Sequence, residues 1–355
     1  MRFALSDDQR MLQASVGKAL AELAPLERVR AYAEGGDCAD IWRGLADMGL
    51  PGLLIPEEHG GLGLGLLEAA LAAEALGAAA APSPFLGSAV LAPLALGGGS
   101  AEQQAKWLPR LAAGEATAGV AISEPVAGVR DGAGVEARDG RLNGKTLFVI
   151  DAEGADILVV ADRTGGLHLV EAPPTPEPMK SIDATRRLSE VTFADTPAEP
   201  LGGNAGLERL RDAAWTMLAA DTLGAAQTML DRAVAYAKER RQFGRVIGSF
   251  QAVKHLCAEM AAELEPARAL VWYAAYAHDN APEEAGLMAA HAKAHLSEIG
   301  RFIARTSTEV HGGIGMTDLL GLHYWFKRIG LDRQLLGGPE RAREAAARAQ
   351  GLVAA

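Results

Sequence analysis

Hydrophobic residues recur every three or four positions along most of the chain, which is the spacing of helices that bury one face. In the middle of the chain the period changes to two, as in β-strands with one buried face. Helical spacing then returns in segments longer than an average globular helix. The pattern predicts an α+β, mainly α protein with an N-terminal helical domain (1–115), a central antiparallel β domain (116–201) and a C-terminal four-helix bundle (202–355).

Capping and turn residues delimit the individual elements. Ser6 and Ser100 each precede a helical segment and suit the N-cap position. Asp139-Gly140 and Asn143-Gly144 are typical of tight turns between antiparallel strands, and the glycine-rich segment 50–65 is expected to be a loop. Expected helices span 7–23, 39–48, 66–77, 101–111, 207–240, 250–279 (kinked at Pro266), 283–308 and 318–350, and expected strands lie in 119–123, 134–150, 155–162, 166–172 and 188–195.

Composition and charge exclude several functional classes. The 355 residues are 49% hydrophobic, but no apolar run approaches the roughly 20 residues of a membrane helix. A formal charge of −11, with Lys and Arg scattered among acids, disfavours nucleic acid as a partner. The first residues lack the pattern of a secretory signal, and the only cysteines, Cys38 and Cys257, suit a reducing compartment. We therefore expect a cytoplasmic location.

Two segments in the C-terminal part suit an anionic cofactor. Residues 240–243, Arg-Arg-Gln-Phe, place guanidinium groups and an aromatic ring at the end of a helix, and the amide of Gln251 follows shortly after. Residues 311–313, His-Gly-Gly, leave backbone N–H groups open to a phosphate. Ordinary helix capping is the alternative interpretation of each segment taken alone.

A third segment, Ser-Glu-Pro from Ser123, ends the first expected strand and can hydrogen-bond the edge of a heterocycle. Phe148, in a later strand, packs either in the core or on a ring. The sequence carries no signature of serine hydrolases, P-loop NTPases, Rossmann nucleotide binders or zincins. No second ligand stands at metal-binding spacing from His311, so no metal is expected.

Taken in order, these segments resemble the acyl-CoA dehydrogenase family over nearly the whole chain. The matching runs are Trp42-Arg-Gly-Leu, Ile55-Pro-Glu-Glu-His-Gly-Gly, Ser123-Glu-Pro, Arg240-Arg-Gln-Phe-Gly with Phe250-Gln, and His311-Gly-Gly-Ile-Gly. The resemblance implies the same three-part fold, with FAD bound between the β domain and the bundle. It also implies α,β-dehydrogenation of an acyl-CoA substrate, an electron-transfer flavoprotein that reoxidises the flavin, and neighbouring protomers that complete the site.

The resemblance implies roles for individual residues as well. Arg240 matches the arginine that binds the diphosphate, with Gln242 and Phe243 beside it. Ser123 matches the hydroxyl residue that bonds the flavin ring, and Phe148 stands where members carry a tryptophan near that ring. The residues matched to contacts made across a dimer with the adenosine half are Gln251, Gly312 and Gly313.

The usual catalytic base is missing from this pattern. Much of the family carries a glutamate before the last helix, where this chain has Leu336 or Gly337, and other members carry it where this chain has Ala214. Ile150 also replaces a threonine hydroxyl near the flavin. Asp221, on the same helical face as Ala214, is the remaining candidate. It lies about 10 Å further along the helix, so a structural hydrogen-bonding role is the favoured interpretation.

Two functions therefore stay open. The chain is either an active dehydrogenase with a relocated base, forming a homo-oligomer, or a base-less partner that completes a flavin site in a heterotetramer with a related subunit. The short chain and the missing glutamate resemble subunits of heterotetrameric dehydrogenases that act on bulky steroid-type CoA thioesters. A third reading, a helical binding module without a cofactor, leaves the arginine and glycine motifs unexplained.

Overall fold

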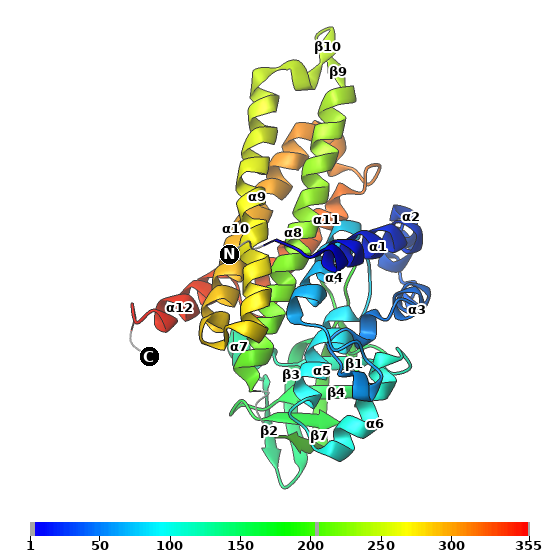
Figure 1. Cartoon of the computed structure of the whole chain (residues 1–355), viewed down its shortest axis with the longest axis vertical. Helices are drawn as coiled ribbons and strands as arrows, with labels where there is room; N and C mark the ends of the chain where they lie inside the picture. The colour runs from blue at the N-terminus through cyan, green and yellow to red at the C-terminus, as the bar shows by residue number, and fades with distance from the viewer. Residues whose placement is uncertain (1–3, 203–205, 354–355) are drawn as a thin grey trace.

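The computed structural model describes residues 4–202 and 206–353 and confirms the expected fold class. Long C-terminal helices form an upright column, the N-terminal helices lie against one side of it, and a sheet lies at its lower end (Figure 1). Among the described residues, no helix is long and apolar enough to cross a membrane.

The N-terminal helices begin close to the positions that the sequence predicts. α1 (Asp7–Leu23) starts at Ser6, which forms a capping box with Gln9. α3 (Ala39–Ala46), α4 (Leu66–Ala79) and α6 (Ala101–Ala112) also follow the hydrophobic pattern. Segment 50–65 holds only the short 3-10 turns η1 (Leu50–Gly52) and η2 (Glu57–His59). The elements not predicted are short: α2 (Leu26–Ala33), the π-helix η3 (Leu86–Leu91) and α5 (Ala92–Leu96).

An eight-stranded sheet forms the centre, in the order β6-β7-β3-β1-β4-β5-β8 with β2 paired to β3. It is mixed rather than purely antiparallel, because β1 and β4 run parallel after the long β3 crossover. The bounds are β1 (Ala118–Ala121), β2 (Gly134–Arg138), β3 (Arg141–Ile150), β4 (Ile157–Ala161), β5 (Leu167–Val170), β6 (Glu177–Met179), β7 (Leu188–Pro197) and β8 (Glu199–Leu201).

One of the two predicted turns is wrong. Asp139-Gly140 does turn the chain between β2 and β3, with both residues at positive φ. Asn143-Gly144 instead lies inside β3, where the register with β7 shifts. Asn143 accepts the Asp195 N–H at 2.8 Å, and Gly144 takes φ 118°. The dipeptide therefore forms a β-bulge, which needs the same glycine conformation as a turn.

The bundle contains α8 (Leu207–Glu239), α9 (Gln251–Asn280) and α10 (Pro282–His311), and α9 continues through Pro266. The predicted last helix, 318–350, is wrong as a single element. It is divided into α11 (Leu322–Gln334) and α12 (Pro339–Ala349), because Leu336 and Gly337 adopt positive φ between them. Short connections are β9 (Arg241–Gln242), β10 (Arg245–Val246), η4 (Ile247–Ser249), η5 (Gly312–Met316) and α7 (Ser123–Ala127).

The main hydrophobic core runs from the N-terminal helices across one face of the sheet into the bundle. A smaller cluster fills the other face of the sheet. Neighbouring residues of β3 illustrate the division, since Val149 belongs to the small cluster and Ile150 to the main core. The end of β3 therefore brings the sheet, α4 and α8 to one place.

Candidate active site

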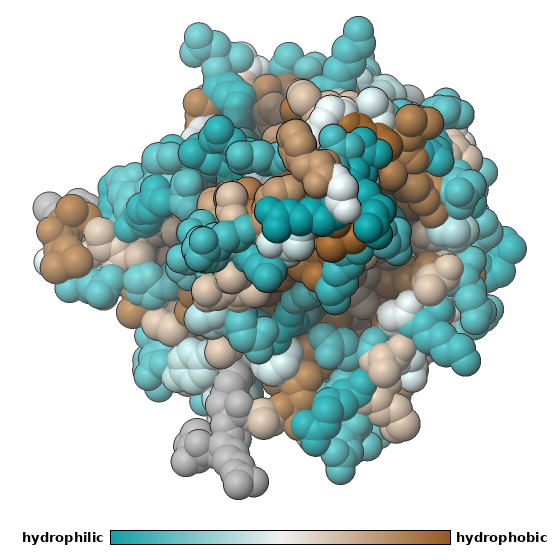
Figure 2. Space-filling model, turned by 90° about the horizontal axis from the view of Figure 1, so that it is seen from above, coloured by the Kyte–Doolittle hydropathy of each residue, from teal (hydrophilic) through white to brown (hydrophobic). Residues whose placement is uncertain are grey.

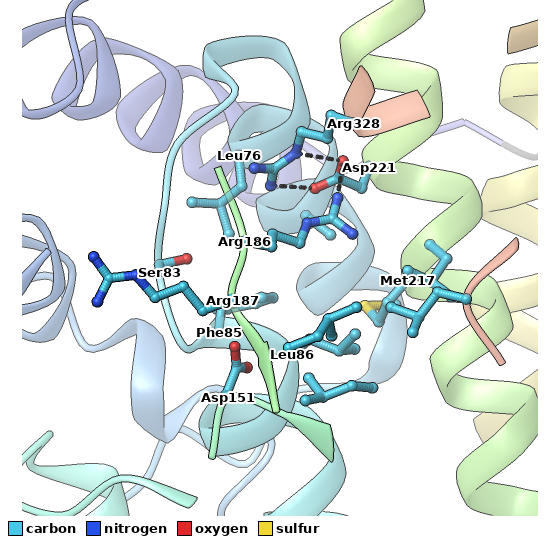
Figure 3. Close-up of a pocket in the computed structure, with 15 residues that line it drawn as sticks. Leu76, Ser83, Phe85, Leu86, Asp151, Arg186, Arg187, Met217, Asp221 and Arg328 are labelled. Atoms are coloured by element: carbon cyan, nitrogen blue, oxygen red, sulfur yellow. Dashed lines mark hydrogen bonds and ion pairs between the residues drawn. The ribbon is translucent and has the colours of Figure 1, made fainter. Parts of the chain in front are cut away.

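A small cavity of about 40 Å³ lies where the sheet, α4, the π-helix and the bundle meet (Figure 3). Most of its wall is aliphatic or aromatic, contributed by residues such as Leu76, Phe85, Ile150 and Met217. Its charged lining residues are Asp151, Arg186, Arg187, Asp221 and Arg328.

A second, wider cleft of about 330 Å³ adjoins this cavity and lies beside α2 and α3. It is lined by more polar residues, including Tyr32 and Cys38. Burial raises the pKa of the Cys38 thiol to about 11, so this cysteine stays a thiol at neutral pH. The residues that line both the cavity and the cleft are Ser83, Asp151, Arg186 and Arg187.

Asp221 is held between two arginines on the cavity wall. Arg328 donates to both carboxylate oxygens, from Nε at 2.8 Å and from Nη2 at 2.7 Å, and Arg186 donates from Nη2 at 2.7 Å (Figure 3). Burial opposes its ionisation, but Arg186 and Arg328 outweigh burial and hold the pKa of Asp221 below its usual value. A carboxylate with three charge-assisted bonds is a poor proton acceptor.

The same network continues to the turn between α11 and α12. Arg186 also pairs with Asp332, which accepts the Thr222 hydroxyl at 3.1 Å. Lys293 donates to the Asp332 and Leu335 carbonyls, and burial lowers its pKa to about 7. Trp215 Nε1 donates to the Leu336 carbonyl at 2.8 Å. These bonds hold Leu336 at φ 57°, a conformation that is strained for leucine.

Asp151 is the cavity carboxylate that no arginine pairs with. It follows β3 directly, and its Oδ2 accepts the Gly87 N–H of the π-helix at 2.8 Å. Burial raises its pKa to about 6, although the backbone N–H of Gly87 and the more distant Arg186 and Arg328 favour the charged form. The residue keeps some accessible surface, and that surface faces the cavity and the cleft.

The raised pKa of Asp151 makes a testable contribution to stability. A carboxyl group whose pKa is higher in the folded state favours folding below its unfolded pKa, and this contribution is lost as pH rises through about 6. Asp151→Asn is therefore expected to raise the free energy of unfolding by roughly 1–3 kcal/mol at pH 7.5 and to change it little at pH 4.5. Urea denaturation at the two pH values measures the difference.

Asp156→Asn is the matched control for this variant. Asp156 also accepts a backbone N–H, that of Thr117 at 2.9 Å, but it is exposed and lies 3.7 Å from Arg110. We expect no gain at pH 7.5 from this control. An equal gain from Asp151→Asn at both pH values would contradict the assignment of the effect to ionisation.

The structure gathers most of the predicted cofactor residues at the end of the bundle far from the sheet. Arg240, Gln242 and Phe243 occupy the β9–β10 hairpin, which Figure 1 shows at the tip of α8 and α9. Phe243 is 92% exposed and takes φ 52°. Gln251 begins α9 beside this hairpin. The view onto this end shows hydrophilic and hydrophobic residues side by side (Figure 2).

The tandem glycines lie at the same end. Tyr236, in the last turn of α8, stacks on His311 with the ring centroids 4.7 Å apart, which brings the start of η5 next to the hairpin. A Cβ at Gly312 or Gly313 would meet no atom within 4 Å, so their backbone faces open space. The arginine, the aromatic ring and the open backbone thus form one exposed group.

Ser123 and Phe148 lie at the opposite end, next to the sheet. Ser123 opens α7 and is buried, and the neighbouring Glu124 accepts the Thr146 hydroxyl at 2.6 Å and the Leu147 N–H at 2.9 Å. Phe148 sits in a bulge of β3 with φ 55°. The guanidinium of Arg130 lies 4.6 Å from the Phe148 ring centroid, so one face of that ring is occupied.

Family models match both helical parts of the chain. The acyl-CoA dehydrogenase N-terminal domain matches residues 6–115, and the acyl-CoA dehydrogenase C-terminal domain matches residues 208–351. The chain belongs to the acyl-CoA dehydrogenase family. Members of this family are oxidoreductase flavoproteins of lipid metabolism that use FAD, which confirms the enzyme class and the cofactor predicted from the sequence.

Relatives of known name cover the whole length. Acyl-CoA dehydrogenase IpdE2 of Mycolicibacterium smegmatis is 35% identical over 339 residues, which are 94% of this chain and 96% of the relative. A chain of the Tcur3481-Tcur3483 steroid ACAD superposes with a TM-score of 0.88 at 30% identity and 98% coverage of both chains. A chain of the ChsE4-ChsE5 complex from Mycobacterium tuberculosis superposes with a TM-score of 0.90 at 26% identity and full coverage of both chains.

The residues of this acyl-CoA dehydrogenase fit the two ends of FAD unequally. The hairpin and the tandem glycines offer exposed guanidinium groups, an aromatic face and open N–H groups, which suit a diphosphate and an adenosine. When bound, FAD supplies the hydride acceptor. Beside the sheet, Ile150 offers no hydroxyl and Phe148 is covered by Arg130 on one face. The positions matched to the usual base hold Leu336, which is 1% exposed, or the buried Gly337, and Ala214, which is 0% exposed.

Sequence reasoning missed the remaining polar residues of the cavity. Asp151, Arg186 and Arg328 carry no local motif, and their partners are far away in the chain: 64 residues separate Asp151 from Gly87, and 107 separate Arg328 from Asp221. Asp221 gave the one signal available in the sequence. An acid on an apolar helical face is expected to have buried cationic partners, but the sequence does not identify which residues they are.

Proposed function

We propose that this chain is a subunit of a heteromeric acyl-CoA dehydrogenase. In that complex it supplies the adenosine and diphosphate side of an FAD site, through Arg240, Gln242, Phe243, Gln251 and the Gly312-Gly313 pair. A related subunit supplies the flavin-ring side and the base that removes the α-proton of the acyl-CoA thioester. An electron-transfer flavoprotein is the predicted acceptor of the electrons.

The proposal rests on two features: which side chains occupy the usual base positions, and how the nearby Asp221 is bonded. The first position holds Leu336 or Gly337 and the second holds Ala214, all buried and without an ionisable group. Asp221, the candidate that the sequence leaves, is bonded by two arginines at 2.7–2.8 Å and its pKa is lowered. The removal of a weakly acidic α-proton needs a base that is free and held close to it. Asp221 is neither.

The separation of the predicted cofactor residues supports an assembly of at least two chains, which a homo-oligomer and a heteromer both provide. Within one chain, the hairpin group and the Ser123–Phe148 group lie at opposite ends of the molecule (Figure 1). In the proposed site, one FAD therefore takes residues from two chains. Two of the most similar structures carry paired names, Tcur3481-Tcur3483 and ChsE4-ChsE5, and the latter is described as a complex.

Co-production tests the proposal directly. The full chain is purified alone and again together with a related subunit that carries a glutamate at one of the usual base positions. We expect a colourless protein from the first preparation, and from the second a yellow complex that an acyl-CoA bleaches. A yellow homo-oligomer that an acyl-CoA bleaches without any partner would overturn the proposal.

Arg240→Ala is expected to weaken FAD retention by the complex about 10–100-fold, because a charge-assisted contact with the diphosphate is lost. The ratio of flavin absorbance to protein absorbance after dilution and gel filtration measures the retention. Arg138→Ala, at an exposed arginine near the β2–β3 turn, is the control and should retain FAD as the unmodified chain does. Unchanged retention in Arg240→Ala would remove Arg240 from the site.

One observation favours the second candidate function, a dehydrogenase that is active by itself. Asp151 is a cavity carboxylate without an arginine partner, and its pKa of about 6 is in the range of a working base. If the chain alone is yellow and turns over an acyl-CoA, loss of turnover in Asp151→Asn would assign that role to Asp151. The co-production experiment separates the two functions before this variant is needed.

A further inference from the structure

The tip of the bundle carries a local excess of positive charge. Residues 238–254, which include the β9–β10 hairpin and are called the basic hairpin from here on, contain one acid, Glu239, and five cations. Their net charge is +4 in a chain whose net charge is −11. The five cations, all of them exposed, are Lys238, Arg240, Arg241, Arg245 and Lys254. The protein therefore concentrates positive charge on one projecting surface, against its overall sign (Figure 1).

These cations have no acidic partner in the parts of the chain that the structure describes. Arg241 Nη2 donates to the Gly244 carbonyl at 3.5 Å, and the Arg245 guanidinium lies 4.0 Å from the Phe250 ring centroid. Both contacts orient a guanidinium without neutralising it. By contrast, Arg141 in the β2–β3 hairpin lies 3.0 Å from a carboxylate oxygen of β7. Several like charges on one short segment repel one another, and an anionic partner would relieve that repulsion.

An aromatic side chain stands in the middle of this charge. Phe243 is 92% exposed, and its ring meets Phe250 edge to face with the centroids 6.1 Å apart. Its φ of 52° is unusual for an aromatic residue, and such strain is found where a side chain serves a function. Exposed aromatic rings and arginines are the side chains that contribute most to protein–protein interfaces. The basic hairpin thus has the composition of an interface as well as of a phosphate site.

FAD accounts for only part of this charge. In the proposed site Arg240 contacts the diphosphate, which leaves Arg241, Arg245 and the two lysines without an anion. Nucleic acid is disfavoured as the remaining anion, because the residues outside the basic hairpin carry the difference between −11 and +4, a net charge of −15. An acidic protein surface next to the bound FAD fits the remaining cations better, since a projecting hairpin can dock on it without bringing the rest of the chain close.

A second copy of this chain offers little acidic surface beside its own sheet end. There the Arg130 guanidinium lies 4.6 Å from the Phe148 ring centroid, and Arg341 donates to a carbonyl of the loop 127–133 at 3.1 Å. Both arginines are exposed, and neither has an acidic partner among residues 4–202 and 206–353. The same loop contributes one acid, Asp131. A homo-oligomer that joined the hairpin end to the sheet end would therefore bring cations against cations.

We propose that the basic hairpin selects the partner subunit. It docks on an acidic surface beside the flavin-ring end of a related subunit, and its charge disfavours docking on a second copy of this chain. Complementary charges across an interface speed association, and like charges suppress binding to the wrong partner. The inference rests on the proposed function, because it names the surface that makes the complex heteromeric.

Charge reversal tests the repulsion on the full chain without any partner. Sedimentation equilibrium at about 50 mM salt compares the unmodified chain with Arg241→Glu/Arg245→Glu and with Arg130→Glu. Each variant places acids against cations, so each should self-associate at least about tenfold more tightly than the unmodified chain. The combination of all three substitutions places acids against acids and should lose that gain. Self-association that is equal or weaker in the first two variants would overturn the proposal.

Co-production with a related subunit tests the attraction. Biolayer interferometry with the immobilised subunit is expected to give a dissociation constant about 10–100-fold higher for Arg241→Glu/Arg245→Glu than for the unmodified chain. Arg241→Lys/Arg245→Lys keeps the charge and should bind within about threefold of the unmodified chain. Arg138→Glu, at an exposed arginine of the β2–β3 hairpin, is the matched control and should not change the affinity. Equal affinity of the reversed variant and the unmodified chain would contradict the docking surface.

Flavin content separates a failure of this inference from a failure of the proposed function. Arg241 and Arg245 are not among the residues assigned to FAD, so the reversed variant should carry as much FAD per complex as the unmodified chain once the complex is saturated. A yellow complex whose affinity ignores the charge of the hairpin would overturn the inference and keep the proposed function. Charge variants that alter self-association in a chain that never acquires FAD with a related subunit would keep the repulsion and refute the proposed function.

Discussion

Asp221→Ala is expected to lower the free energy of unfolding by roughly 3–5 kcal/mol, because it leaves the buried Arg328 without an anion and Arg186 with Asp332 alone. The side chains of Arg328 and Arg186 are 4% and 14% exposed, so water can replace the lost carboxylate only in part. The network joins the segment before β7 to α8 and α11, and its loss weakens contacts between all three. Urea denaturation of the full chain at pH 7 measures the change.

Two further variants separate the charge from the packing. Asp221→Asn keeps the shape and one acceptor oxygen but loses the charge. It should therefore lower the free energy of unfolding by less than the alanine variant does. Asp231→Ala, at an exposed acid on the same helix that accepts a hydrogen bond from Gln227, should change the unfolding free energy by no more than about 0.5 kcal/mol. A loss below about 1 kcal/mol in Asp221→Ala would show that Asp221 does not hold the arginines in place.

Gly224→Ala is expected to destabilise the protein by about 3 kcal/mol, although alanine is the better helix former by about 1 kcal/mol. A Cβ at Gly224 would lie 1.8 Å from the Glu74 carbonyl oxygen, and one at Gly77 would lie 2.0 Å from the Asp221 carbonyl oxygen. α4 and α8 therefore touch backbone to backbone through reciprocal glycines. A backbone atom cannot rotate away as a side chain does, so the helices must separate.

Gly330→Ala is the matched control for this prediction. Gly330 also lies inside a helix, α11, but a Cβ there would meet nothing within 4 Å. That variant should be neutral or more stable by up to about 1 kcal/mol, from helix propensity alone. The difference in thermal midpoint between the two variants measures the close contact of α4 with α8. Similar midpoints would contradict it.

The predicted elements agree best with the structure where the hydrophobic pattern lies within one segment and extends over many residues. α1 matches its prediction at both ends, because its hydrophobic period and the Ser6 capping box lie within the helix itself. α8 and α9 also follow their predicted spans closely. α2 was not predicted because only Val29 and Tyr32 of its eight residues are buried, which leaves a weak hydrophobic pattern. The predicted helix 318–350 is interrupted at Leu336 and Gly337. The backbone conformation of Leu336 depends on Trp215 and Lys293, which lie in other helices.

The amino-acid order by itself determined the helix–sheet–helix sequence of this protein and the motifs that place it among acyl-CoA dehydrogenases, because period, caps and short motifs are properties of neighbouring residues. Only the tertiary structure decided that the predicted cofactor residues form two separate groups, that Asp221 is bound by Arg186 and Arg328, and that Asp151 pairs with no arginine that the structure describes. These outcomes depend on contacts between residues up to 107 positions apart, and no local pattern records which distant charges will meet.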